Sequence, residues 1–173
     1  MTAPPVEAAR PAAADDLAAI GRLFHLASIA IAPERGGAVH LTHELRASST
    51  AAADLAAAVT DANRLVLVGT IDAVVVGYLV AVQARGHDGA GVLVRVTDLF
   101  VEEDGRSVGV GHEMLLAACD WAAAHGAIGL DAYALPGARN TKNFFEAHGF
   151  KARLLVVHHS FAPGTPPSSE AQP

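Results

Sequence analysis

An arginine and three glycines lie in the run 105–111, between an apolar β-branched stretch and an amphipathic one. A loop that leads into a helix offers backbone N–H groups without an intrahelical acceptor, and the helix dipole favours negative charge there. Glycine lets a ligand approach the backbone closely. The pattern therefore predicts a place for a phosphate or pyrophosphate, although an ordinary strand–turn–helix corner carries the same residue types.

The glycine spacing excludes two common phosphate-binding motifs. Gly105, Gly109 and Gly111 do not occupy the first, third and sixth positions of the dinucleotide motif, and no Gly-Lys-Ser/Thr follows. What remains is Arg-x-x-Gly-x-Gly at 106–111, between an expected strand and an expected helix. This arrangement resembles the acyl-coenzyme-A loop of the GNAT superfamily of N-acetyltransferases.

Two further segments carry the same resemblance. Residues 144–150, Phe-Phe-Glu-Ala-His-Gly-Phe, are similar to the end of the family's helix before its final strands, and residues 10–20 look like its opening strand and helix. The resemblance extends over 6–161, which we expect to be one acetyltransferase domain. Residues 1–5 are then a flexible start, and the Pro/Ser-rich residues 162–173 a disordered tail.

The hydrophobic pattern predicts elements in the order β-αα-βββ-α-β-α-β. We expect strands at about 6–11, 64–69, 73–84, 91–101, 128–133 and 150–161, and helices at 17–24, within 40–60, at 109–125 and at 139–148. The apolar stretch 65–82 is interrupted by Asp72 and Gly77 and is rich in valine, so a buried hairpin is expected there, not a membrane span. The fold class is α/β, and the resemblance implies a mixed, mostly antiparallel sheet of six to seven strands flanked by about four helices.

Composition limits the class of protein. A length of 173 residues favours one domain, and a formal charge of −6 argues against general nucleic-acid binding. The charge is compatible with a cationic substrate, although a solvated acidic surface is the more common reason for such a charge. Cys119 is alone and cannot form an internal disulfide, and no basic region followed by an apolar run begins the chain, so we expect a cytoplasmic protein outside the membrane.

The resemblance implies that acetyl-CoA is the acyl donor. Backbone N–H groups of the 106–111 loop would hold the pyrophosphate, the main chain of residues 99–101 would pair with the pantetheine arm, and an N–H near Phe100 or Val101 would donate to the developing oxyanion. Arg106 either adds a positive charge or is a solvated loop residue. The implied cofactor-binding residues are Leu99, Phe100, Val101, Arg106, Ser107, Val108, Gly109, Val110, Gly111, Asn140 and Asn143.

The acid and the base of the reaction are less well marked. Thr97 stands where many relatives carry a glutamate, which leaves Asp98 as a base acting through water, as an anchor for the amine, or as a purely structural carboxylate. Phe145 stands at the family's usual phenol position and cannot donate a proton. Tyr133, on the neighbouring expected strand, is the substitute candidate, and the alternative is a thiolate that leaves unaided.

These residues predict acetyl transfer to a primary amine, of a small molecule, by direct attack in a ternary complex. Two alternatives are a protein amino-terminus or lysine acetyltransferase and a non-catalytic acyl-CoA sensor. His40 and His43 have helical i, i+3 spacing but no third ligand is indicated, so no metal is expected. A homodimer through edge strands is an analogy with such folds.

Overall fold

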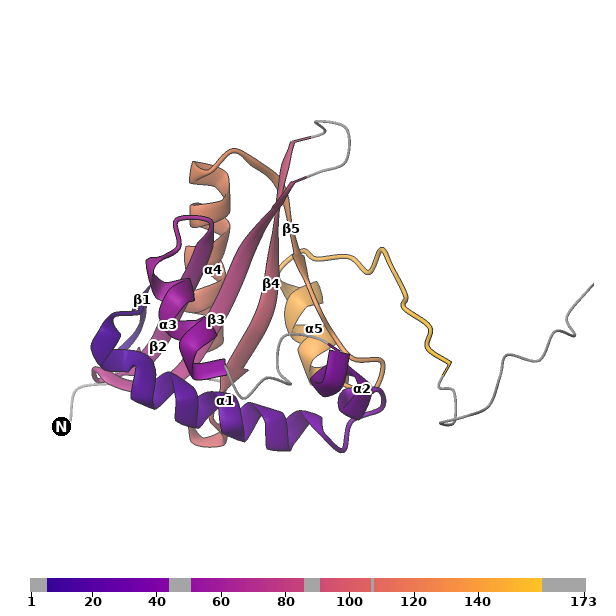
Figure 1. The fold of residues 1–173 in the computed structure, drawn as a ribbon, viewed down its shortest axis with the longest axis horizontal. Helices are drawn as coiled ribbons and strands as arrows, with labels where there is room; N and C mark the ends of the chain where they lie inside the picture. Colours follow the sequence, from indigo (N-terminus) through magenta and orange to yellow (C-terminus); the bar gives the residue numbers. More distant parts are fainter. Residues whose placement is uncertain (1–5, 44–50, 86–90, 107, 160–173) are drawn as a thin grey trace, which may run out of the picture.

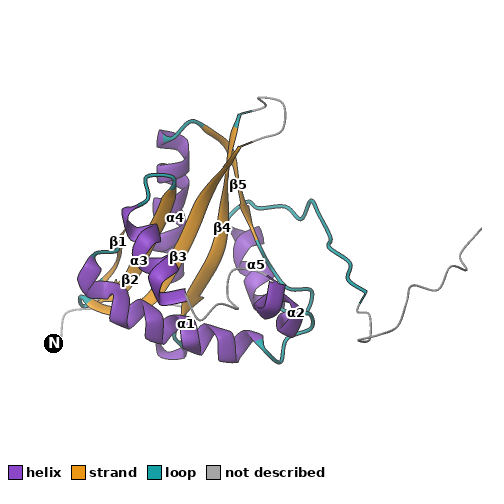
Figure 2. Cartoon of the chain, viewed as in Figure 1, coloured by secondary structure: helices purple, strands orange, loops and turns teal. Residues whose placement is uncertain are grey.

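The computed structural model describes residues 6–43, 51–85, 91–106 and 108–159. The strands are β1 (Glu7–Pro11), β2 (Arg64–Ile71), β3 (Val74–Arg85), β4 (Val92–Val101) and β5 (Ala127–Ala132). The α-helices are α1 (Leu17–Ile31), α2 (Gly37–His43), α3 (Ala51–Thr60), α4 (Val110–Ala124) and α5 (Arg139–Ala147), with short 3-10 turns at Ala14–Asp16 and Glu103–Gly105. Figures 1 and 2 show one mixed α/β fold around a central sheet.

The sheet has the order β1-β2-β3-β4-β5, antiparallel from β1 to β4 and parallel between β4 and β5. Helix α4 covers one face, where Met114 and Ala118 pack with residues of β2, β3 and β4. Helices α1 and α3 cover the other face, where Ile20 and Leu23 pack against β2 and β3. The sheet is therefore the middle layer of three, and the two apolar cores lie on its two sides.

The predicted hairpin is confirmed. Residues 65–70 of β2 are all buried, because both faces of the strand are covered by helices, and such strands have continuous apolar runs. The turn lies at Asp72 and Ala73, with φ of 47° and 67°, so β2 extends to Ile71, two residues beyond its predicted end. The Asp72 carboxylate accepts a hydrogen bond from the Val6 amide at 3.0 Å, which ties the start of β1 to this turn.

Helix α4 begins and ends at glycines, within one residue of the predicted bounds. Gly109 precedes it with φ +105° and Gly126 follows it with φ +69°, backbone conformations that L side chains rarely adopt. Its buried positions, Val110, Met114 and Ala118, recur every four residues and face the sheet. The amphipathic pattern therefore fixes both the extent of the helix and the face that it buries.

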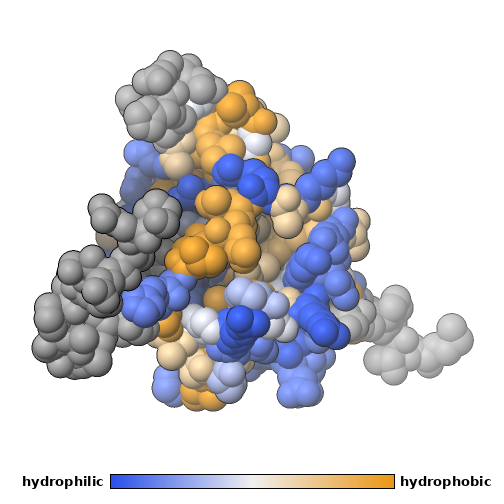
Figure 3. Space-filling view, turned by 90° about the vertical axis from the view of Figure 1, so that its right-hand side faces the viewer, coloured by the Kyte–Doolittle hydropathy of each residue, from blue (hydrophilic) through white to orange (hydrophobic). Residues whose placement is uncertain are grey.

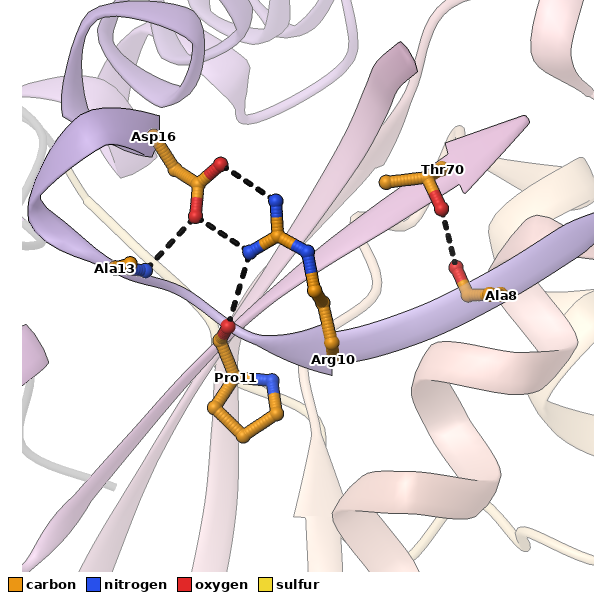
Figure 4. Close-up of polar contacts among 6 residues, drawn as sticks. All are labelled: Ala8, Arg10, Pro11, Ala13, Asp16 and Thr70. Carbon is orange, nitrogen blue, oxygen red and sulfur yellow. Dashed lines mark hydrogen bonds and ion pairs between the residues drawn. The ribbon is translucent and has the colours of Figure 1, made fainter. Parts of the chain in front are cut away.

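A bidentate ion pair ties β1 to the turn that begins α1 (Figure 4). The Arg10 guanidinium donates to both carboxylate oxygens of Asp16, at 2.6 and 2.8 Å, and the Ala13 amide donates to the same carboxylate at 2.8 Å. The hydrogen bonds from Arg10 lower the pKa of Asp16, against the opposing effect of burial. This contact fixes the entry into the α1 layer.

The predicted final strand at 150–161 is wrong over 151–159, which have no regular structure and lie exposed. Arg153 forms an ion pair with Asp131 of β5, but the backbone that follows pairs with no described strand. The sheet of the described residues thus has five strands, not six or seven. The expected helical region 40–60 contains the end of α2 and all of α3, so the described helices number five instead of four.

Some expectations fall outside the described residues. The flexible start at 1–5 and the disordered tail at 162–173 are among them. Within the described ranges, no helix combines the length and the apolar character needed to cross a bilayer.

Candidate functional site

Strands β4 and β5 pair over only part of their length. β5 pairs with Val92–Val96 of β4, whereas β3 continues to pair with β4 as far as Val101. Over residues 97–101, the edge of β4 that faces away from β3 therefore has no strand partner among the described residues. An unpaired strand edge presents backbone N–H and C=O groups to an extended ligand.

The hydrogen-bond alternation of an antiparallel pair shows which peptide groups face this open edge. The Glu102 amide donates to the Val76 carbonyl oxygen of β3 at 2.9 Å, so Phe100, two residues earlier, also faces β3. Leu99 and Val101 then face away from β3. Of the two amides expected to reach the oxyanion, the one of Val101 lies on the open edge and the one of Phe100 does not.

A β-bulge at Thr97 decides where Asp98 points. Val80 of β3 lies opposite Asp98, and the next residue, Ala81, lies opposite Val96, so Thr97 is an extra residue in β4. Strict alternation would put residues 96 and 98 on one face. Instead, Val96 packs in the α4 core while Asp98 accepts a hydrogen bond from the Tyr78 hydroxyl at 3.2 Å on the α1 side.

Tyr78 is a site residue that the sequence reasoning missed. Its side chain is fully buried between Phe24 of α1 and Phe100 of β4, with ring centroids 6.3 and 6.5 Å away. The sequence shows Tyr78 only as one residue of an apolar strand. Its hydroxyl reaches Asp98 because of the antiparallel register of β3 and β4, which the sequence does not reveal. The pair combines a phenol and a carboxylate beside the open part of β4.

The loop between β4 and α4 ends in a run of helix amides. The first intrahelical bond of α4 runs from the Glu113 amide to the Gly109 carbonyl oxygen at 3.0 Å. The amides of Val110, Gly111 and His112 therefore have no acceptor within the helix, and they lie at the positive end of its dipole. Ser107 lies outside the described residues, and Val108 is exposed.

Arg106 is folded onto the end of β4 although its side chain is exposed. Its Nε donates to the Val101 carbonyl oxygen at 2.9 Å, on the open edge of the strand. Its guanidinium carbon lies 5.6 Å from the centre of the Phe100 ring, within the range of a cation–π contact. A positive charge is thus held at the junction of the open edge and the loop.

Helix α5 lies beside the N-terminal end of α4. A Cβ added at Gly111 would lie 3.5 Å from the ring of Phe144, so the glycine permits this close approach. Asn140 and Asn143 are both exposed on α5. Phe145 is buried and packs against Phe150 with ring centroids 5.2 Å apart, as a structural residue would.

Two histidines that the sequence did not single out meet at this junction. His148 Nδ1 lies 2.7 Å from the Phe144 carbonyl oxygen, so this nitrogen must be the donor. His112 Nδ1 lies 2.7 Å from His148 Nε2, so in the neutral pair His112 donates and His148 accepts. The second nitrogen of His112, Nε2, is then an acceptor at the N-terminus of α4.

Tyr133, the expected acid, follows β5 and is partly exposed. Its ring makes an edge contact with His40 of α2 at 6.3 Å, and the Arg95 guanidinium lies 5.5 Å from its centre. These contacts place it beside α2. Among the described residues, no group of three or more His, Cys, Asp and Glu side chains is arranged to hold a metal ion.

A hollow of about 510 Å³ lies where α1 crosses the ends of β3 and β4. Leu26 and Ala30 of α1, Val76 and Phe100 form its apolar part, and the segment 102–106 forms its polar part. Glu102 is held by an ion pair with Arg22 of α1. The hollow therefore shares Phe100 and Arg106 with the open edge, and its wall carries carboxylates.

Comparisons with known proteins identify the family and the fold of the chain. The model of a family described as "Acetyltransferase (GNAT) domain" matches residues 62–152, which is more than half of the chain and runs from β2 to just beyond α5. No curated protein matches the chain.

Several solved structures share the fold. The aminoglycoside N-acetyltransferase AAC(6′)-Iy in complex with CoA superposes with a TM-score of 0.71 at 15% identity, covering 93% of this chain and 98% of that one. A tetramutant of a Bacillus halodurans protein gives 0.72 at 18% identity, covering 88% and 99%. The aminoglycoside acetyltransferase meta-AAC0020, from an uncultured soil metagenomic sample and in complex with sisomicin, gives 0.66 at 18% identity, covering 90% and 95%.

Proposed function

Because the chain belongs to the GNAT family of acetyltransferases, we propose that it transfers the acetyl group of acetyl-CoA to a primary amine of a small molecule. The observation that carries the proposal is the partial pairing of β4 and β5, which leaves the peptide groups of Leu99 and Val101 on an open edge. This edge leads directly to Arg106 and the N-terminus of α4. An extended arm that ends in a diphosphate fits such a succession of groups.

The binding roles follow from the positions of the backbone groups. Leu99 and Val101 pair with the pantetheine arm, and the loop 106–111 with the first turn of α4 holds the pyrophosphate. Arg106 adds a positive charge from the end of β4. The exposed Asn140 and Asn143 of α5 flank the carrier on the other side.

The chemical step is direct attack of the neutral amine on the thioester carbonyl carbon. The tetrahedral oxyanion receives a hydrogen bond from the Val101 amide, the C–S bond breaks, and the thiolate leaves. The amine's proton passes to Asp98, directly or through water, and Tyr78 holds that carboxylate in place. Tyr133 or water returns a proton to the thiolate, because the buried Phe145 cannot.

The shape and charge of the hollow support a small, cationic acceptor. A volume of about 510 Å³ lies within the range of small-molecule sites, roughly 300–1,000 Å³. Carboxylates on its wall attract a protonated amine. We propose a cytoplasmic reaction, because the chain has a single cysteine, Cys119, as is usual in a reducing compartment.

The test is thiol release from acetyl-CoA with a panel of amines that includes aminoglycosides, polyamines and lysine peptides. Turnover with a small amine, and an acetylated product in mass spectrometry, is the expected result. Turnover with peptides only would favour the protein acetyltransferase. Stabilisation by CoA without turnover on any acceptor would favour the sensor, for which the phenyl ring of Phe145 is the supporting feature.

The role of Asp98 is tested separately. Asp98→Asn should lower kcat/KM by about 10²-fold or more, the usual effect of losing a general base, and should flatten the pH profile. Asp120→Asn, an exposed carboxylate on α4, is the matched control and should leave both unchanged. Full turnover of Asp98→Asn at every pH would exclude Asp98 from proton transfer.

A further inference from the structure

Arg95 of β4 is a charged side chain that the proposed reaction does not use. Its neighbours Val94 and Val96 pack in the core under α4, so Arg95 points to the opposite face of the sheet, which α1 and α3 cover. The bulge at Thr97 puts Asp98 on this same face. An arginine and an aspartate of one strand therefore share a face, and the aspartate lies beside the open edge of β4.

The Arg95 guanidinium is held in place but lacks a hydrogen-bond acceptor. Its carbon atom lies 5.5 Å from the centre of the Tyr133 ring, within the range of a cation–π contact, and His40 of α2 makes an edge contact with the same ring at 6.3 Å. Among the described residues, no hydrogen bond or ion pair takes up the N–H groups of Arg95. A guanidinium presents five such donors in a planar fork, which matches a carboxylate bidentately.

Asp131 of β5 lies opposite Arg95 in the parallel pair but does not supply that acceptor. Both of its carboxylate oxygens accept hydrogen bonds from Arg153, one of them from Nε at 2.8 Å. The hydrogen bonds from Arg153 are the main cause of the lowered pKa of Asp131, against the effect of burial, and the charge of Arg95 adds to it. Arg95 is therefore near a carboxylate that is already paired, and its own donors are available to a ligand.

We propose that Arg95 binds a carboxylate of the acceptor, so that the substrate is a small molecule with both a primary amine and a carboxylate, as in an amino acid. The inference rests on the acetyl transfer proposed above and specifies its acceptor, which is cationic at its amine end. The amine meets Asp98, and the carboxylate meets Arg95 on the same face of β4. Two groups of opposite charge on one face match the two charges of such a molecule.

The distance between the two groups suits a small molecule. Residues 95 and 98 are three positions apart, which is at most about 10 Å along a strand. Ala132 of β5 lies opposite Val96, and Tyr133 is one residue further along the parallel pair. The contact with Tyr133 therefore directs the Arg95 guanidinium along β4 toward Asp98, which shortens the gap that the acceptor must span.

A carboxylate suits this place better than a phosphate. Asp131 adds a negative charge near Arg95, and a group with one negative charge is repelled less than a phosphate group, which carries about two. The side of the molecule with α2 and α5 faces the viewer in Figure 3, and hydrophilic patches lie beside apolar ones on it. An amine and one carboxylate on a small carbon frame match both the charges and this mixed surface.

The first test compares α-amino acids and β-alanine with their own carboxamides as acceptors, by thiol release from acetyl-CoA at one pH. For the amino acid that reacts fastest, kcat/KM should exceed that of its amide by about 10- to 100-fold, because the amide loses the charge-assisted hydrogen bonds. The amine of an amide is the less basic one, which works against this preference. Equal or better turnover of the amides overturns the inference and leaves the proposed function standing. Thiol release with no amine at all removes both.

The second test changes the arginine. Arg95→Gln should bring the ratio of kcat/KM for acid over amide to about one, through a higher KM for the acid. Arg95→Lys keeps the charge without the planar fork and should keep part of the ratio. Arg153→Gln is the matched control, because it removes the other arginine beside Asp131 and should leave the ratio unchanged. A ratio that survives Arg95→Gln, or that Arg153→Gln lowers equally, contradicts the inference.

The ratio separates recognition of the carboxylate from a role of Arg95 in the fold. A variant with a damaged structure loses turnover of the acid and of the amide alike, and the ratio stays as in the wild type. Arg95 is only half-buried, so Arg95→Gln should keep its circular dichroism and its affinity for CoA, measured by calorimetry. If Arg95→Gln does not fold, Arg95→Lys decides, since an unchanged ratio in that variant contradicts bidentate binding.

Discussion

The β2–β3 hairpin and the β4–β5 pair differ although they belong to one sheet. β2 and β3 pair from Arg64–Val82 to Ile71–Val74, and side chains of both strands are buried on both faces. β4 and β5 pair over half of β4, and Ile128 on β5 is exposed. The β2–β3 hairpin, which we call the closed side, stabilises the fold. The β4–β5 pair, which we call the open side, leaves backbone and apolar groups available for binding.

The difference shows how one sheet separates stability from function. On the closed side the two strands pair along their length and pack against helices on both faces, so changes there should act on the free energy of unfolding. On the open side, residues 97–101 of β4 pair with β3 but with no second strand among the described residues, and they include the bulge at Thr97. Changes there should therefore act on binding. Four substitutions test this division.

Leu79→Ala on the closed side should have the largest effect. Leu79 is fully buried in β3, and truncation of such a residue costs about 2–5 kcal/mol of unfolding free energy through lost burial and the cavity left behind. Urea unfolding measures it. Leu116→Ala, an exposed leucine on α4, is the control and should cost about 0.5 kcal/mol or less. Similar losses for both would remove the distinction between buried and exposed positions.

Gly109→Ala at the start of α4 should weaken CoA binding by about tenfold, or about 1.4 kcal/mol. The φ of +105° strains any L side chain and shifts the amides that follow. Gly126→Ala at the other end of α4, where φ is +69°, introduces a similar strain away from the loop. Calorimetry should find CoA binding weakened in the first variant alone. Equal affinity in the two variants would argue against a ligand at the N-terminus of α4.

Asp16→Asn should cost about 1 kcal/mol at neutral pH, a modest value because Arg10 is half exposed. Arg10 lowers the pKa of Asp16, so the folded chain binds this proton less readily than the unfolded chain. The contribution is complete above the ordinary pKa of aspartate, about 4, and is lost as the pH falls through the lowered folded value.

The difference in unfolding free energy between wild type and Asp16→Asn should therefore shrink on acidification below about pH 4. Urea unfolding at pH 7 and at acid pH measures this difference. If the difference in unfolding free energy stays constant or grows on acidification, the Arg10 ion pair does not act through this carboxylate.

Arg153→Gln on the open side should have the smallest effect. Arg153 lowers the pKa of Asp131 and pairs with it, but the Arg153 side chain is 61% exposed, so the solvent-screened pair should contribute little to the free energy of unfolding. Urea unfolding checks this. A loss as large as that of Asp16→Asn would show that residues 151–159 pack as part of the fold.

Much of the fold follows from local pattern. The valine-rich run that forms β2 and β3, the four-residue spacing of Val110, Met114 and Ala118, and the glycines at the ends of α4 each act within a few residues of the chain. The final strand was also predicted from a local apolar pattern, and that prediction is wrong. Its apolar pattern is that of a strand, but pairing requires a partner edge that the local sequence does not specify.

The candidate site divides in the same way. The sequence by itself was enough to propose anion binding at the loop 106–111, because glycine positions and a helix start are local features. Only the tertiary structure decided that Asp98 meets Tyr78, that Val101 and not Phe100 faces the open edge, and that His112 meets His148. These contacts depend on the register of β3 against β4, the bulge at Thr97 and the packing of α5 on α4. Register and packing are set by the sum of many side-chain contacts between distant segments, and no single stretch of sequence contains them.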